Sequence, residues 1–393
     1  PAGSPDALAA ALAAGADAVY LGLGELDARR GADGFQVADL PRLVAQAHAA
    51  GARVHLTLNI QLGHRELGRA ARTLAWAEQS GVDAVLVADP GLIALMPCFP
   101  KLQLHVSTQA GIGSSAGVRA MQALGAHRVV VARELSLDEI AACIGIGPEI
   151  EVFAQGALCF SVSGRCSLTS WVGGHSGNRG TCTSICRVGW SCNGGAQARP
   201  MDMKDLSALP LLPRLAELGV HSLKIEGRLK KPAWVRTAVD LFRRARAGGD
   251  LAAIAAEAQQ LGDYTGRDLT AAYLDGSRVG LIHPDEGRAA SSEPPRDDQD
   301  PPRRIAVAIV RDGKQWGVAL TLGQRSERFA ITAPVAHAGR AVNGRELRER
   351  LAEALRAHTE LAEFTADGAF LVPRRTANDL CARIADWARP RHD

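Results

Sequence analysis

A glycine followed by a short apolar run recurs along the first 230 residues, and this repeat constrains the fold more than any other feature. Each time, a segment with helical spacing of apolar residues precedes Gly-Ala or Gly-Val, at Gly15, Gly51, Gly81, Gly125 and Gly219. Glycine suits the left-handed residue just past a helix end. The continuously apolar run after it is typical of a parallel strand buried on both faces.

Two further apolar runs lack that glycine but have the same strand character. The sequence therefore predicts seven strands, at Asp17–Leu21, Arg53–Leu58, Asp83–Val87, Leu102–Val106, Arg128–Val131, Ile150–Phe153 and His221–Ile225. Repeated alternation of strand and helix implies a parallel sheet with right-handed crossovers. An open doubly wound sheet is the rival. Seven strands, with an eighth lost before Pro1, favour an α/β fold of the (β/α)8 TIM-barrel type.

The chain divides into three expected regions. Residues 1–250 form the barrel, including a cysteine-rich insertion at 156–200, and residues 251–304 form a helical and linker segment. Its end, Ser291–Arg304, carries two Pro-Pro pairs and no apolar period, as solvated chain does. Residues 305–393 form a small α+β domain, because alternating strand patterns precede helical ones.

Composition excludes some classes of protein. Apolar residues make up 47% of the chain and charged residues 22%, which is typical of a globular protein. A net charge of only +3 gives no electrostatic argument for nucleic acid. No apolar run approaches the roughly 18 residues that span a bilayer, and no signal peptide is visible. The expected compartment is the cytoplasm.

Polar residues that follow the predicted strands are candidates for a site, because a parallel barrel carries its working residues at the carboxyl ends of its strands. Such residues also occur at any strand-to-loop transition, where ordinary hydrogen bonds satisfy them. Lys224 and Glu226 lie on alternate positions of one strand and therefore share a face. They could form an ion pair, or they could form with Arg228 a basic clamp that binds a carboxylate or phosphate. The other candidates are Asn59, Asp89, His105, Ser107, Gln109, Arg133, Glu134 and Gln155.

Cysteines cluster in the insertion. Cys159 is followed after six residues by Cys166, after fifteen by Cys182 and after three by Cys186, with Cys192 beyond. Four thiolates can hold zinc or an iron–sulfur cluster. Structural zinc usually uses pairs two to four residues apart, so the wide spacing favours a cluster, while zinc and metal-free thiols stay open. The spacing does not support cysteine nucleophiles with His105 or His175 as base.

Six segments in order resemble the collagenase-like peptidase family, peptidase family U32. They are Pro1–Ser4, Gly15–Gly22, His105–Gln109, Phe153–Cys159, Ser163–Cys166 and Lys224–Arg228. In that family a short strand normally precedes the Pro-Ala-Gly turn, and the sequence lacks it. The resemblance implies two alternative activities. Some members are described as proteases, including collagen-degrading ones, and others take part in oxygen-independent hydroxylation of ribosomal RNA cytidine, transfer RNA uridine or the ubiquinone ring.

The resemblance also implies a cofactor. Members of the hydroxylation group resemble iron–sulfur proteins with four cysteine ligands, and the RNA-modifying ones depend on prephenate. The expected ligands of a 4Fe–4S cluster are Cys159, Cys166, Cys182 and Cys186, with Cys192 as an alternative fourth. Cysteine spacing and the small final domain are most similar to the ribosomal RNA cytidine members.

Three hypotheses follow. In the first, an RNA hydroxylase, Arg165, Lys224 and Arg228 bind the carboxylates of a prephenate-like cosubstrate. The acceptor base or oxygen donor is oriented by Asn59, His105, Ser107 and Gln109, and His105, Gln109 and Glu226 are the catalytic candidates. The second hypothesis is a collagenase-like peptidase, although the chain has no nucleophile elbow and no His-Glu-x-x-His motif. The third is a non-catalytic partner of the ubiquinone type. RNA is implied by the resemblance alone, because the few aromatic residues provide no visible stacking platform.

Overall fold

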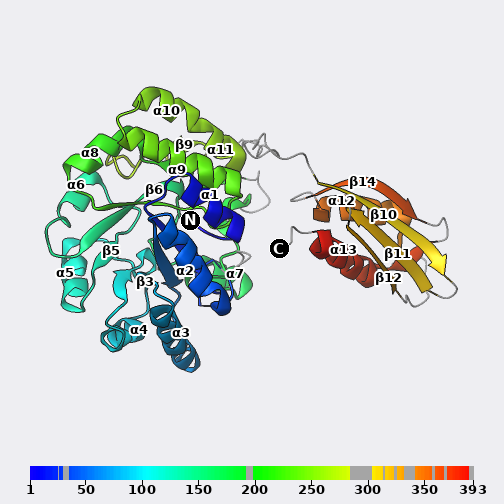
Figure 1. The fold of residues 1–393 in the computed structure, drawn as a ribbon. Coiled ribbons are helices and arrows are strands. Elements are labelled where there is room, and N and C mark those ends of the chain that lie inside the picture. Colours follow the sequence, from blue (N-terminus) through cyan, green and yellow to red (C-terminus); the bar gives the residue numbers. More distant parts are fainter. Residues whose placement is uncertain are drawn as a thin grey trace. The chain divides into compact units, whose positions relative to one another are not determined.

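The chain consists of two compact units, Pro1–Arg296 and Asp297–Asp393. The structure is a computed structural model, shown in Figure 1. It describes residues 1–24, 26–29, 35–191, 198–283, 303–312, 315–322, 325–331, 341–355, 359–366 and 370–388. The predicted linker Ser291–Arg304 lies almost entirely outside the described residues, as does Cys192.

All seven predicted strands are present in the first unit, and they form one parallel arrangement. Six pair in sequence order and the seventh pairs in parallel with β6: β1 (Ala18–Gly22), β2 (Arg53–Leu58), β3 (Ala84–Val87), β4 (Gln103–Val106), β5 (Arg128–Val130), β6 (Glu149–Ala157) and β8 (Ser222–Ile225). Two short strands were not predicted. β7 (Asp205–Ser207) pairs antiparallel with the end of β6, and β9 (Leu269–Thr270) pairs with β7.

Helices lie around the outside of this sheet (Figure 1). They are α1 (Pro5–Ala13), α2 (Leu40–Ala49), α3 (Leu67–Gln79), α4 (Pro90–Leu95), α5 (Ser115–Ala123), α6 (Leu137–Ala141), α8 (Leu212–Glu217), α9 (Pro232–Arg246), α10 (Leu251–Glu257) and α11 (Gln259–Thr265). The five repeated glycines all have left-handed backbone angles, with φ between 75° and 84°, which confirms their predicted place after helices. No helix in the described ranges is long and apolar enough to cross a membrane.

The sheet is not closed by a continuous ladder among the described residues. β1 pairs with β2 and β8 pairs with β6, but no strand pairing joins β8 to β1 there. The Tyr20 hydroxyl on β1 donates to the carbonyl oxygen of Ile225 on β8 at 2.9 Å, so one side chain spans this gap. The predicted α/β fold with a largely parallel sheet is confirmed. Closure of this sheet into an eight-stranded barrel stays a prediction.

The side of the sheet that faces the helices is apolar, whereas its interior is partly polar. Leu8, Leu43 and Trp234 from the helices are fully buried. Inside the sheet, five side chains that can carry charge are also buried: His55, His105, Arg128, Glu151 and Lys224. Buried charges require partners. These five buried side chains therefore belong to a network of groups that can carry charge, inside the sheet and below the carboxyl ends of the strands.

The second unit has its own sheet and core, as the predicted α+β domain requires. Its sheet has the order β12 (Arg325–Ile331), β11 (Gln315–Leu322), β10 (Arg303–Asp312) and β14 (Thr359–Ala366), with a separate pair β13 (Ala341–Asn343) and β15 (Leu371–Pro373). Helices α12 (Gly344–Leu355) and α13 (Arg374–Ala388) bury Leu347, Leu351 and Ile384 against Ile305 and Val307.

Candidate functional site

A pocket that is partly open to solvent lies at the carboxyl ends of the parallel strands. This is the place where parallel barrels carry their sites. Six of the eight predicted non-cysteine residues line it: Asn59, Ser107, Gln109, Lys224, Glu226 and Arg228. The remaining lining residues are Tyr20, Ala28, Arg29, Thr57, Leu86, Thr108, Val130, Arg133 and Phe153. The structure therefore brings together predicted residues from β2, β4 and β8.

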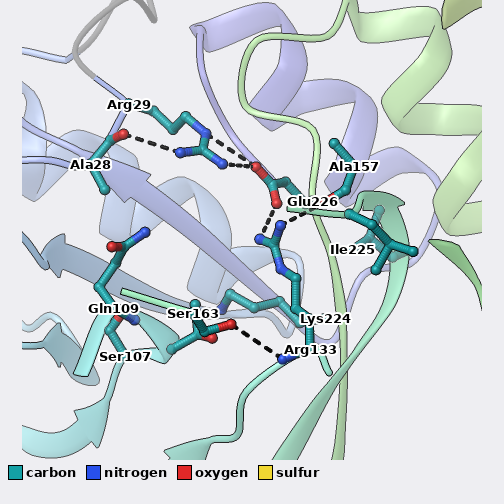
Figure 2. Close-up of polar contacts among 12 residues, drawn as sticks. Ala28, Arg29, Ser107, Gln109, Arg133, Ala157, Ser163, Lys224, Ile225 and Glu226 are labelled. Atoms are coloured by element: carbon teal, nitrogen blue, oxygen red, sulfur yellow. Dashed lines mark hydrogen bonds and ion pairs between the residues drawn. The ribbon is translucent and has the colours of Figure 1, made fainter. Parts of the chain in front are cut away.

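Glu226 lies between two arginines (Figure 2). Arg29 donates to Oε1 of Glu226 through Nε at 3.1 Å and through Nη2, and Arg133 donates to Oε2 through Nη2. Burial alone would raise the pKa of Glu226, but the charges of Arg133 and Arg29 outweigh it and hold that pKa far below its usual value. Glu226 is therefore ionised throughout the physiological range and cannot serve there as a proton donor.

The other two basic residues predicted for this pocket have internal partners. Arg228 donates through Nη2 to Oδ1 of Asp27 at 2.6 Å and through Nη1 to the Thr57 hydroxyl at 3.0 Å. Lys224 donates to Oε1 of Glu151 at 2.7 Å, so it pairs with Glu151 rather than with Glu226. Both cations of the predicted basic clamp are thus neutralised within the protein.

Three polar side chains fix the opposite wall. The backbone N–H of Ala28 donates to Oδ1 of Asn59 at 3.0 Å, and Nδ2 of Asn59 donates to the Ser107 hydroxyl at 3.2 Å. The backbone N–H of Gln109 donates to the same hydroxyl at 3.3 Å. The side-chain amide of Gln109 lines the pocket without a hydrogen-bond partner among the described residues. This amide can both donate and accept toward a ligand.

His105 lies in the interior below these residues and is not among those that line the pocket. Its ring contacts the His55 ring edge-on, with centroids 4.7 Å apart, and neither ring nitrogen of His105 has a partner in the described ranges. Burial and the neighbouring His55 lower the pKa of His105 to about 2. The imidazole is therefore neutral, and its predicted catalytic role is not favoured by this position.

Arg165 is exposed beside the pocket. A Cβ atom placed on Gly111 would lie 3.2 Å from Nε of Arg165, and one on Gly164 would lie 2.1 Å from the carbonyl oxygen of Gln109. Gly164 and Arg165 therefore pack closely against the Gln109–Gly111 segment. Gly164 has a left-handed φ of 72°. Arg165 has no ion pair with any described residue.

The four predicted ligand cysteines influence one another electrostatically. Burial raises the pKa of Cys159, with further increases from Cys166 and Cys182. Burial also raises the pKa of Cys186, with further increases from Cys159 and Cys182. A Cβ atom on Gly177 would lie 3.7 Å from Cβ of Cys182 and 3.9 Å from Cβ of Cys166. The uneven spacing in sequence thus becomes proximity in space.

The thiols do not form a compact single-ion site. No three His, Cys, Asp or Glu side chains of the described residues could hold one metal ion. The donor set itself suits a soft metal, because thiolates select such metals and two of the cysteines, Cys166 and Cys182, lie on either side of Gly177 at contact distance of a Cβ placed there. The chemistry of the donor set therefore fits a group that thiolates bind, either zinc or an iron–sulfur cluster.

Two important pocket residues were given no role in the sequence-based hypotheses. Arg133 follows β5 and was noted at a strand end, but nothing in the sequence separated it from the other strand ends. Arg29 lies in the loop after β1, where no motif or periodicity marks it. Arg133 also links the pocket to the cysteines, since its charge lowers the pKa of Cys159 and its Nη1 donates to the Ala157 carbonyl at 2.6 Å.

Comparison with known proteins identifies relatives of the first unit. The model of peptidase family U32 matches residues 3–280. The tRNA hydroxylation protein P of Escherichia coli (strain K12) is 32% identical over 300 residues, covering 62% of this chain and 66% of the relative. The 23S rRNA 5-hydroxycytidine C2501 synthase of the same organism is 36% identical over 237 residues, covering 58% and 36%.

A collagenase of Porphyromonas gingivalis (strain ATCC BAA-308 / W83) is 30% identical over 308 residues, covering 71% of this chain and 73% of the relative. The matched regions span 66% of the transfer RNA protein and 36% of the ribosomal RNA synthase. The family match covers most of the chain and includes the strands, the pocket and the cysteines. This chain belongs to peptidase family U32.

Proposed function

We propose that this chain hydroxylates a pyrimidine in RNA without molecular oxygen, with a 4Fe–4S cluster bound by Cys159, Cys166, Cys182 and Cys186. The names of two relatives, one acting on transfer RNA and one on 23S ribosomal RNA, support this class of reaction. The single observation that carries the proposal is the position of Arg133. It lines the pocket and is also within electrostatic reach of Cys159.

The four thiols can bind a cluster or zinc, and the uneven spacing of the cysteines in the sequence favours a cluster, because structural zinc usually uses cysteine pairs two to four residues apart. Raised pKa values keep Cys159 and Cys186 protonated without a metal, so iron binding would release protons. When bound, the cluster would supply one-electron redox chemistry.

The pocket offers what recognition of a flipped-out pyrimidine requires. The free amide of Gln109 can pair with the donor and acceptor edge of a base, and Asn59 is held in one orientation beside it. Tyr20 and Phe153 provide aromatic walls, each with a cation over its ring, Lys224 at 4.2 Å and Arg133 at 3.9 Å. Arg133 also lines the pocket, so its guanidinium would lie beside a bound base.

The cysteine-rich insertion provides exposed groups that suit RNA. The Trp171 side chain on α7 (Leu168–Gly173) is 86% exposed, and Phe160 is also exposed. Arg165 lies nearby in sequence with a free guanidinium. Exposed aromatic rings stack on unpaired bases, and arginine contacts phosphate. Local recognition of this kind compensates for the low net charge of the chain.

A small carboxylate cosubstrate, prephenate-like as the family resemblance implies, belongs to the same proposal. Of the three residues predicted to bind it, Lys224 and Arg228 already have carboxylate partners, whereas Arg165, which lies beside Gly111, has no ion pair with any described residue. Arg165 is therefore the one of the three that can meet a carboxylate without breaking an internal ion pair.

Peptidase activity has less support from the pocket. A protease needs an activated nucleophile or water. Ser107 accepts two hydrogen bonds, His105 lies below the pocket as a neutral ring, and Glu226 is paired with two arginines. None of these three supplies a base next to a nucleophile.

The proposal is tested by nucleoside mass spectrometry of ribosomal and transfer RNA from a strain that lacks the gene. We expect the loss of one hydroxylated pyrimidine. The wild-type chain and the Cys98→Ala variant, which alters an exposed cysteine outside the insertion, should restore it, and Cys182→Ala should not. An unchanged set of hydroxylated pyrimidines in the deletion strain would contradict the proposal.

A further inference from the structure

Glu226 occupies a position that a ligand carboxylate could take. Arg29 presents the Nε–Nη2 edge of its guanidinium to Oε1, and Arg133 presents Nη2 to Oε2 (Figure 2). Guanidinium edges match carboxylates in this way. Both arginines line the pocket, and we refer to Arg29 and Arg133 together as the two-arginine site.

Glu226 is more exposed than the two other buried carboxylates near the pocket. Asp27 accepts from Arg228 and from the backbone N–H of Arg29, and Glu151 accepts from Lys224, Arg128 and Ser222. The side chains of Asp27 and Glu151 are each 4% exposed, whereas that of Glu226 is 14% exposed. Glu226 accepts side-chain hydrogen bonds from the two pocket arginines alone among the described residues.

Only the side chain of Glu226 needs to move to vacate this position. Its backbone N–H donates to the Gln155 carbonyl at 2.8 Å. A Cβ atom on Gly156, whose φ is 125°, would lie 2.8 Å from Cβ and from the carbonyl oxygen of Glu226. The main chain is therefore fixed by close packing, and rotation about side-chain bonds is the movement that remains.

The charges at the two-arginine site favour a second anion. Two guanidinium groups face one carboxylate, which leaves one positive charge in excess. Nε of Arg133 is buried and has no partner among the described residues, so it is an additional donor. A buried donor without a partner is costly, and a ligand oxygen would satisfy it.

We propose that the two-arginine site binds the carboxylate of a small ligand with a flat ring, and that Glu226 occupies the site until this ligand displaces it. Tyr20 and Phe153 form the walls that would hold the ring. The inference rests on the proposed function in that it assigns the anion-binding residues of the same pocket. It places them at Arg29, which the sequence did not mark, and at Arg133, which the sequence marked only as one of several strand-end candidates.

The test measures binding of phenylacetate by isothermal titration calorimetry to the anaerobically purified full chain, with the uncharged phenylacetamide as matched probe. Glu226→Gln should bind phenylacetate at least about tenfold more tightly than the wild type, because both arginines then face the ligand. Arg29→Met should abolish this binding. Glu149→Gln, which removes a half-exposed carboxylate that pairs with Arg128, should leave the affinity unchanged.

Equal or weaker phenylacetate binding by Glu226→Gln would overturn the inference, as would an equal gain for phenylacetamide. Should Glu226→Gln fail to fold by circular dichroism, Glu226→Asp replaces it, because the shorter side chain cannot reach both arginines. That variant should bind phenylacetate several-fold more tightly than the wild type, and no gain would also overturn the inference. The assay needs neither RNA nor iron, so its result is separate from that of the nucleoside test.

Discussion

The guanidinium of Arg133 lies over the ring of Phe153, with its carbon 3.9 Å from the ring centroid. Stacking of this kind stabilises an arginine in one orientation. From that orientation Arg133 contacts Glu226 in the pocket and the carbonyl of Ala157, two residues before Cys159. One side chain thus fixes the geometry between the pocket and the cysteines.

Replacement of Arg133 by lysine keeps the charge but removes the planar fork. We expect Arg133→Lys to lower the formation of the hydroxylated pyrimidine at least about tenfold, because one ammonium group cannot contact Glu226, Ala157 and the Phe153 ring together. RNA affinity and thermal stability should change little. Complementation of the deletion strain measures the first effect, and Arg119→Lys on α5, an exposed position, is the control.

Glu151 gives a prediction about stability and pH. Burial alone would raise its pKa, but Lys224 and Arg128 outweigh this and hold the pKa below its usual value. Its contribution to stability is therefore complete above the unfolded value of about 4.3 and is lost as the pH falls through the lower folded pKa. Glu151→Gln should lower the free energy of unfolding by about 3–5 kcal/mol at pH 7, because the buried Lys224 loses its carboxylate partner and Arg128 keeps only the half-exposed Glu149.

The matched control is Glu149→Gln on the same strand, whose side chain is 46% exposed. Glu149→Gln should lower the free energy of unfolding by less than about 1 kcal/mol. Denaturant unfolding at pH 7 and at acid pH measures both variants. The difference between the wild type and Glu151→Gln should shrink at acid pH, and a difference that grows as the pH falls would refute the assignment.

Trp171 gives a prediction about RNA. Because its side chain is 86% exposed, Trp171→Ala should leave the melting temperature unchanged. It should weaken binding of a single-stranded pyrimidine-containing RNA by about 1–3 kcal/mol, the usual contribution of one stacked base. Fluorescence anisotropy measures the affinity. Trp76→Ala on α3, 51% exposed, is the control, and equal effects of the two variants would exclude Trp171 as a specific contact.

The strands could be predicted from the sequence because each carries its own local signal. A left-handed glycine and a run of apolar residues are visible without knowledge of the partner strand. β7 and β9 were missed because three and two residues are too few to show a period. The pairing of Lys224 with Glu151 was also missed, since it depends on the register between β6 and β8.

From the sequence, the candidate site could be predicted only for residues that follow a strand, because parallel barrels carry their working residues there. Asn59, Ser107 and Gln109 follow strands directly, so their place around one pocket could be expected. Arg29 reaches the pocket from a loop, and the local spacing of apolar residues does not predict the conformation of a loop. Likewise, the sequence places His105 on β4, but which layer of the interior it occupies depends on the packing of all the strands.

The metal content of anaerobically purified protein shows whether the four cysteines bind an iron–sulfur cluster. We expect about four iron atoms and four sulfides per chain, as one 4Fe–4S cluster requires. Cys159→Ala, Cys166→Ala, Cys182→Ala and Cys186→Ala should each lose most of this iron, while Cys98→Ala retains it. Stoichiometric zinc, or a folded protein without iron and sulfide, would show that these cysteines do not bind such a cluster.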